Sequence, residues 1–98
     1  MFGGQRAVAL GYQQLTATAA LITPTVPTGA NAAVISIETN AARYRDDGTA
    51  PTAAVGNLIP VTASGLPFEF TGSINQLLFF PVAAGAATVN IAYYKLSG

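Results

Sequence analysis

Apolar and polar residues alternate along most of this chain, which is the pattern typical of β-strands. Between the alternating stretches lie Gly, Pro, Asn and Asp, the residues that favour turns. The alternation predicts seven short strands, at residues 15–21, 33–37, 43–46, 58–63, 66–70, 74–82 and 89–94. Pro60 favours an edge position for the strand at 58–63. Such closely spaced strands, without a helical period, indicate an all-β fold: a single small β-sandwich or barrel (jelly-roll-like) with about seven short antiparallel strands.

One predicted strand is apolar at consecutive rather than alternate positions. Leu77, Leu78, Phe79 and Phe80 follow one another without a polar break. In a strand the first and third of these residues share one face, and the second and fourth share the other. We therefore expect this strand at the centre of the domain, with one face on the core and the other covered by a second sheet or a neighbouring subunit.

The first fourteen residues differ from the rest of the chain. Val8, Leu10 and Tyr12 alternate with smaller residues, but three glycines in this segment weaken any strand. We expect residues 1–14 to form an N-terminal arm that adds to a neighbour's sheet, or alternatively a frayed end. Residues 15–98 then form the β-sandwich domain.

Charge is unusually sparse. The chain has 98 residues, which is enough for one domain with a modest core. Charged residues make up 8% of it, against about 25% in a typical soluble domain, and the net charge is zero. Because so little charge of either sign favours association, we expect neighbours to cover much of the surface, in a homo-oligomer (trimer or dimer) or a larger assembly.

The sequence lacks the residues on which most catalytic and metal sites depend. It contains no cysteine and no histidine, which excludes disulfides and the usual zinc sites. Nucleophile–base pairs need such residues or an activated lysine, and the single lysine, Lys95, lies near the end of the chain. We expect a protein that is not an enzyme and has no catalytic residue, no cofactor and no metal ion.

Neither nucleic acid nor a membrane is an expected partner. The four cationic residues are scattered or adjacent to acids, so they form no basic patch. The uncharged stretches 7–37 and 70–94 are broken by Pro, Gly, Gln and Asn, which is unlike a membrane-spanning helix. The N-terminal segment also lacks the continuous apolar core of a signal peptide, which favours synthesis in the cytoplasm.

Half of the charged residues lie in one short segment. Arg43, Arg45, Asp46 and Asp47 are four of the eight charged side chains. On a strand the two arginines share a face, and Tyr44 points to the opposite side, where a core is expected. The two acids end the strand, and the Asp-Gly step that follows favours a turn with positive φ at the glycine.

Three roles fit this cluster. The four charges can form an ion-pair group within the chain that braces a long turn. They can also form a bidentate Arg–Asp lock between subunits. A calcium site is the third role, but two adjacent carboxylates fall short of the six to eight oxygen ligands that calcium takes.

The tyrosines raise a different possibility. Tyr12, Tyr44, Tyr93 and Tyr94 offer flat rings of the kind that glycan-binding modules use. Tryptophan is absent, however, and we expect no cluster of acidic or amide residues with the tyrosines. Each tyrosine is equally expected as a core or interface aromatic with its hydroxyl in water.

Two segments resemble a known family. Residues 42–61 contain R-x-R-D-D-G-x-x-P-T followed by Gly56, and residues 76–95 end in the strand V-x-I-x-Y-Y. Together they resemble small structural proteins of tailed bacteriophages, over about half the chain. The resemblance implies a capsid decoration (cement) protein in the virion, made in the host cytoplasm. Its partner would be the major capsid protein or another virion protein.

Two alternatives to capsid decoration remain open. One is a small tail, neck or baseplate component, and the other is a receptor- or glycan-binding β-module. The residues expected at interfaces or in structural roles are Arg43, Arg45, Asp46, Asp47, Leu77, Phe79, Phe80 and Tyr94.

Overall fold

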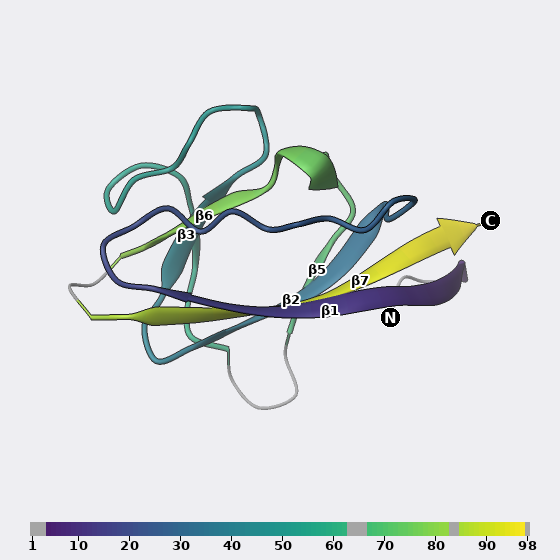
Figure 1. Cartoon of the computed structure of the whole chain (residues 1–98), viewed down its shortest axis with the longest axis horizontal. Helices are drawn as coiled ribbons and strands as arrows, with labels where there is room; N and C mark the ends of the chain where they lie inside the picture. Colours follow the sequence, from purple (N-terminus) through teal and green to yellow (C-terminus); the bar gives the residue numbers. More distant parts are fainter. Residues whose placement is uncertain (1–3, 63–66, 83–84, 98) are drawn as a thin grey trace.

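A computed structural model describes residues 4–62, 67–82 and 85–97 of the chain (Figure 1). These residues form seven strands and one short 3-10 helix. In chain order the elements are β1 (Arg6–Ala17), β2 (Ala32–Glu38), β3 (Ala42–Arg45), β4 (Asn57–Ile59), β5 (Phe68–Phe70), η1 (Ile74–Gln76), β6 (Leu78–Pro81) and β7 (Ala87–Ser97). The all-β prediction is confirmed.

The strands form two antiparallel sheets that pack face to face. One sheet has the order β1-β7-β2-β5 and the other the order β4-β3-β6. Tyr44 of β3 joins the sheets, because its ring lies 5.6 Å from that of Phe68 and 5.8 Å from that of Phe70, both on β5. As predicted, Tyr44 therefore faces the core.

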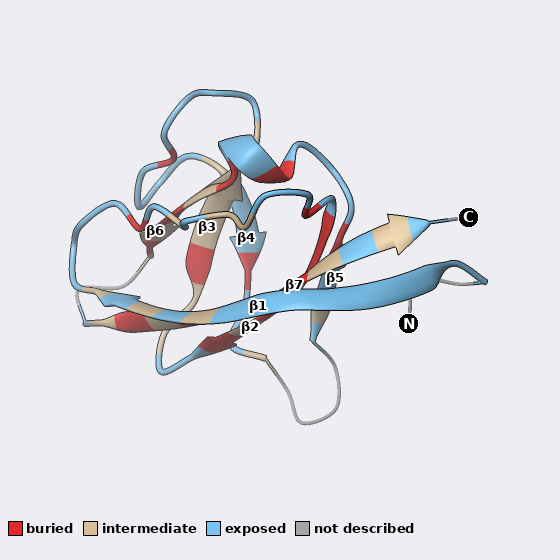
Figure 2. Cartoon of the chain, turned by 45° about the vertical axis from the view of Figure 1, so that its right-hand side comes forward, coloured by how far each residue is buried: buried red, intermediate tan, exposed pale blue. Residues whose placement is uncertain are grey.

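The core follows from strict alternation on the two central strands. On β7, Val89, Ile91 and Tyr93 are fully buried, while the residues between them face outward and are partly exposed. Ile35 and Ile37 of β2 lie beside them in register and are also fully buried. Figure 2 shows these buried positions on β2 and β7, with β1 largely exposed in front of them.

The first strand departs from the prediction. A strand was expected at 15–21, but β1 runs from Arg6 to Ala17, and Ala19 has a positive φ of 51°. The expected boundary between residues 14 and 15 lies inside β1, which pairs with β7 along its length apart from a bulge between Ala9 and Gly11. The long ladder with β7 outweighs the cost of the glycine. Addition of residues 1–14 to a neighbour's sheet remains a prediction.

The consecutive apolar run straddles two elements. Leu77 follows the 3-10 turn η1, so the strand expected from residue 74 begins only at Leu78. Leu77 and Phe79 are buried, whereas Leu78 and Phe80 are partly exposed. The expected division into two faces is therefore confirmed. β6 is the end strand of its sheet rather than a central one, and its outer face is only partly covered within the chain.

Two smaller expectations concern edges and spans. Pro60 predicted an edge position for the strand beside it, and β4 is the other end strand of the three-stranded sheet. Within the described residues, the structure contains no helix with the length and apolar character needed to span a membrane.

Candidate functional site

The charged segment forms the start of the loop between β3 and β4. Arg45 donates two hydrogen bonds to Asp47, from Nε to Oδ1 at 3.1 Å and from Nη2 to Oδ2 at 2.5 Å. Asp47 also accepts from the Thr49 N–H, and Gly48 has the expected positive φ of 84°. The hydrogen bonds from Arg45 lower the pKa of Asp47 and raise that of Arg45 itself. The bidentate pair therefore closes the turn within one chain.

Arg43 has a different role from the one expected. Its Nε donates to the Ala53 carbonyl at 3.1 Å, and its Nη1 donates to the Gly56 carbonyl at 3.0 Å. Gly56 has a φ of 136°, and a Cβ there would lie 3.1 Å from the Cβ atoms of both Arg43 and Pro51. Arg43 therefore binds backbone carbonyl groups at the far end of the loop rather than an acidic side chain.

The predicted four-charge group is thus two separate braces. The structure brings Arg45 and Asp47 together, but Arg43 has no acidic partner among the described residues. Asp46 lies beside Tyr44, whose pKa is raised by burial and by that carboxylate. Among the described residues no group of three or more possible acidic ligands surrounds a potential metal position. The spacing of the charged residues could not predict that Arg43 and Arg45 have different partners. Arg43 binds backbone carbonyl groups, and every residue has such a group, so the sequence gives no sign of which ones it binds.

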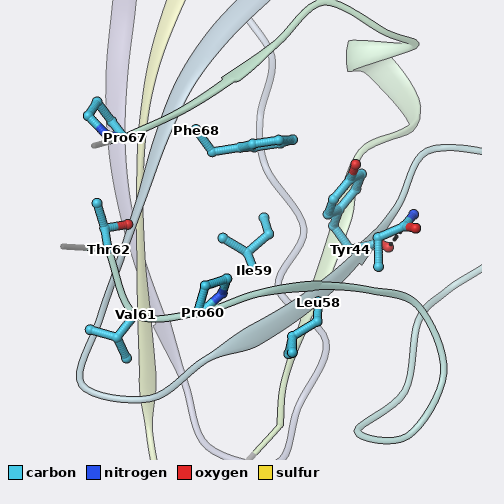
Figure 3. Close-up of a pocket in the computed structure, with 9 residues that line it drawn as sticks. Tyr44, Leu58, Ile59, Pro60, Val61, Thr62, Pro67 and Phe68 are labelled. Carbon is cyan, nitrogen blue, oxygen red and sulfur yellow. Dashed lines mark hydrogen bonds between the residues drawn. The ribbon is translucent and has the colours of Figure 1, made fainter. Parts of the chain in front are cut away.

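An apolar hollow lies between β4 and β5, which are end strands of the two sheets. Its volume is about 440 Å³, and it opens between β4 and β5 (Figure 3). The lining residues are Tyr44, Asn57, Leu58, Ile59, Pro60, Val61, Thr62, Pro67 and Phe68. In Figure 3 the rings of Tyr44 and Phe68 and the side chain of Ile59 surround one space.

The floor of this hollow is held to both sheets. Thr62 exchanges two hydrogen bonds with Ile37 at the end of β2, from Ile37 N to Thr62 Oγ1 at 2.8 Å and from Thr62 N to the Ile37 carbonyl at 2.9 Å. The segment that follows β4 therefore crosses from one sheet to the other. Leu58 and Val61, which border the hollow, are 54% and 48% exposed, so apolar surface remains open to solvent.

A second exposed apolar region is the free edge of β1. Val8, Leu10 and Tyr12 are all exposed, and no charged side chain occurs from Ala7 to Ala17. Natural proteins usually protect long edge strands with lysine, proline or a bulge, and here the bulge after Ala9 is the only such device within the described strand. A long edge strand with a single bulge as its protection remains a template for pairing with another chain.

The outer face of the four-stranded sheet carries a hydrogen-bonded polar group. Asn90 of β7 accepts from the Tyr12 hydroxyl at 2.7 Å and from Gln14 Nε2 at 2.9 Å, and it donates to Glu38 at 2.6 Å. The expectation that amide and acidic residues stay apart from the tyrosines was therefore wrong. Tyr12 and Asn90 are 78 residues apart, so only pairing of β1 with β7 joins them.

Gln13 makes the matching contact on the inner side of β1. Its Oε1 accepts from the Tyr93 hydroxyl at 2.7 Å and from the Thr25 N–H at 2.9 Å. Burial raises the pKa of Tyr93 to about 12. Gln13 therefore ties the loop before β2 to the core, a role that its sequence neighbours give no sign of.

The remaining expected interface residues divide between core and surface. Leu77 and Phe79 belong to the core, so they are not available to a partner. Phe80 and Tyr94 are partly exposed, and Tyr94 lies on the outer face of the four-stranded sheet beside Ala32.

The sequence has no His or Cys to pair with a hydroxyl, and the described residues that line the apolar hollow carry no charge. Comparisons with family models, with curated proteins and with solved structures find nothing that matches this chain.

Proposed function

We propose that this chain is a non-enzymatic subunit of a larger protein assembly. The edge of β1 is the observation that supports the proposal best. Twelve residues in a strand extend about 40 Å, and the longest dimension of the molecule is 40 Å. One side of the molecule therefore offers a long strand edge that has no charge after Arg6 and exposes Val8, Leu10 and Tyr12, and a partner strand would satisfy it.

Within this class, we propose capsid decoration in a phage virion. The resemblance of residues 42–61 and 76–95 to small phage structural proteins supports that choice. The mechanism would be passive: the subunit buries apolar surface against capsid subunits and against copies of itself, and so opposes separation of the shell. A small tail, neck or baseplate component would use the same surfaces on a different part of the particle.

Binding to purified particles tests this proposal. Phage heads and tails that lack the chain are prepared separately, mixed with the labelled protein and sedimented. Co-sedimentation with heads supports decoration, and co-sedimentation with tails supports the alternative. Val8→Lys places a charge on the β1 edge and should reduce binding, whereas Leu21→Lys, at an exposed apolar position outside β1, should not. The proposal is wrong if the wild-type protein stays in the supernatant with both particles.

A glycan-binding module is the second candidate. It is favoured by the hydrogen-bonded group of Asn90, Tyr12, Gln14 and Glu38, called the Asn90 group below. Tyr12 is 62% exposed, and Asn90 fixes its hydroxyl beside Gln14 and Glu38. A flat ring with amide and carboxylate groups next to it offers both a stacking surface and hydrogen-bond partners for a sugar. Since Glu38 is negative, neutral glycans are the expected ligands.

A glycan array, followed by NMR titration with the best neutral oligosaccharide, tests this candidate. Asn90→Ala should abolish binding, because it removes the group that orients Tyr12 and Gln14. Thr16→Val, on the same face but outside the Asn90 group, serves as the matched control. Binding that survives Asn90→Ala, or no binding by the wild type, removes the candidate.

A further inference from the structure

The exposed apolar side chains are concentrated in two places. Among the described residues, seven large apolar side chains are exposed. Val8, Leu10 and Tyr12 lie on β1, and Leu58 and Val61 border the hollow between β4 and β5. Five of these seven side chains therefore belong to one protruding strand edge or to one concave site.

These two places lie at opposite ends of the molecule's larger sheet. In the order β1-β7-β2-β5, β1 is one end strand and β5 is the other. Figure 1 shows β1 at the front of the molecule and β5 behind it. The strand edge of one copy cannot reach the hollow of the same copy, because β7 and β2 lie between them, but it can reach the hollow of a second copy.

The two surfaces also match in chemistry. No charged side chain occurs on β1 after Arg6, and none of the described residues that line the hollow is charged. Bringing them together therefore buries apolar surface without removing from water a charge of residues 7–17 or of the hollow's lining, which is the costly step in many interfaces. Two copies that pair through their β1 edges would leave both hollows open. A contact between β1 of one copy and the hollow of another covers both kinds of exposed apolar region.

Strand addition gives this contact a defined geometry. β4 and β5 are end strands, so each has an edge with no strand beside it among the described residues. A strand placed along either edge gains main-chain hydrogen bonds, and alternate side chains then point toward the hollow. The bulge after Ala9 pairs Val8 with Lys95 and Tyr12 with Ala92, so these two side chains lie on opposite faces of β1 and only one of them points toward the hollow. The volume of the hollow, about 440 Å³, is within the range of sites that bind a ligand.

We propose that β1 of one copy docks into the β4–β5 hollow of the next copy, in a head-to-tail contact. The proposal rests on the assembly function above and names the partner: a second copy of this chain. Such a contact uses a different surface on each side, so it forms a ring where the rotation closes and a filament where it does not.

Two charge variants, alone and mixed, test the contact. Val8→Lys blocks the strand edge and Leu58→Lys blocks the hollow, with Val61→Lys as a second variant of the hollow. All three positions are exposed, so circular dichroism should show the wild-type fold. Light scattering coupled to gel filtration then gives the mass of each species. Leu21→Lys is the control, since Leu21 is exposed and apolar but lies in neither region.

The head-to-tail contact predicts a specific pattern. Wild type and Leu21→Lys form the same oligomer, while each blocked variant associates at least about tenfold more weakly. An equimolar mixture of Val8→Lys and Leu58→Lys forms dimers and nothing larger, because one intact edge meets one intact hollow. A contact between two β1 edges predicts instead that Leu58→Lys assembles like the wild type, and that result overturns the proposal.

Two further outcomes separate this proposal from the assembly function. If the wild type stays monomeric up to about 1 mM but binds phage heads or tails, the head-to-tail contact is wrong and the assembly function stands. If it stays monomeric and binds neither particle, both are wrong. A mixture of the two blocked variants that remains monomeric, beside an oligomeric wild type, also overturns the contact.

Discussion

Phe79 and Phe80 are adjacent, chemically identical and oppositely placed, so they separate the core from the surface of β6. Phe79 is fully buried in the hydrophobic cluster, and its backbone N–H and carbonyl both bond to Ile22. Phe80 is partly exposed on the other face. We expect Phe79→Ala to destabilise the fold far more than Phe80→Ala.

The magnitudes follow from burial. Truncating a fully buried Phe removes its transfer free energy and leaves a cavity, at a cost of about 3–5 kcal/mol. For a domain of this size that corresponds to a fall in Tm of at least about 12 °C. At Phe80 only part of the ring leaves water and no enclosed cavity forms, so the cost should be about 1–2 kcal/mol.

Chemical and thermal denaturation followed by circular dichroism measure both changes. Where Phe79→Ala is too unstable to purify, Phe79→Leu should give a smaller loss in the same direction, because it leaves a smaller cavity. Equal losses at the two positions, or a larger loss at Phe80, would refute the assignment of the two faces. Phe80→Asp then tests the surface: lost assembly with an intact fold shows that a neighbour covers it.

Three further predictions concern the contacts that hold the loops and β1. Gln13→Ala should cost about 1–3 kcal/mol in urea denaturation, because the Tyr93 hydroxyl and the Thr25 N–H lose their acceptor; a wild-type midpoint would contradict this. Burial raises the pKa of Tyr93 from 10.0 to about 12 in the folded state. The buried neutral hydroxyl therefore contributes fully to the free energy of unfolding below pH 10, and this contribution is lost as the pH rises toward 12. Tyr93→Phe should therefore lose less stability than the wild type between pH 9 and pH 12, and parallel pH profiles would exclude this role. Gly56→Ala should lower Tm and increase proteolysis of the β3–β4 loop, since a side chain there meets Arg43 at positive φ, whereas unchanged proteolysis would show that the loop adapts.

The sequence alone determined the class of the fold and the main part of its core. Alternation at Val89, Ile91 and Tyr93 predicted which side of the last strand faces inward, since a period of two leaves only one apolar face. The uninterrupted run at Leu77–Phe80 likewise showed that one face belonged to the core. Pro60 predicted an edge strand, because proline cannot donate a ladder hydrogen bond.

Only the tertiary structure decided which residues meet across the chain. Strand pairing brings distant partners to Gln13 and Asn90, and loop carbonyl groups bind Arg43. Neither strand pairing nor a carbonyl contact leaves a pattern in the nearby sequence. β1 is a strand in spite of Gly11 because β7 supplies a ladder beside it on both sides of the bulge between Ala9 and Gly11, and a propensity cannot anticipate that ladder. The hollow lies between β4 and β5 because the sheet order makes both of them end strands, and sheet order is a property of the whole chain rather than of any segment.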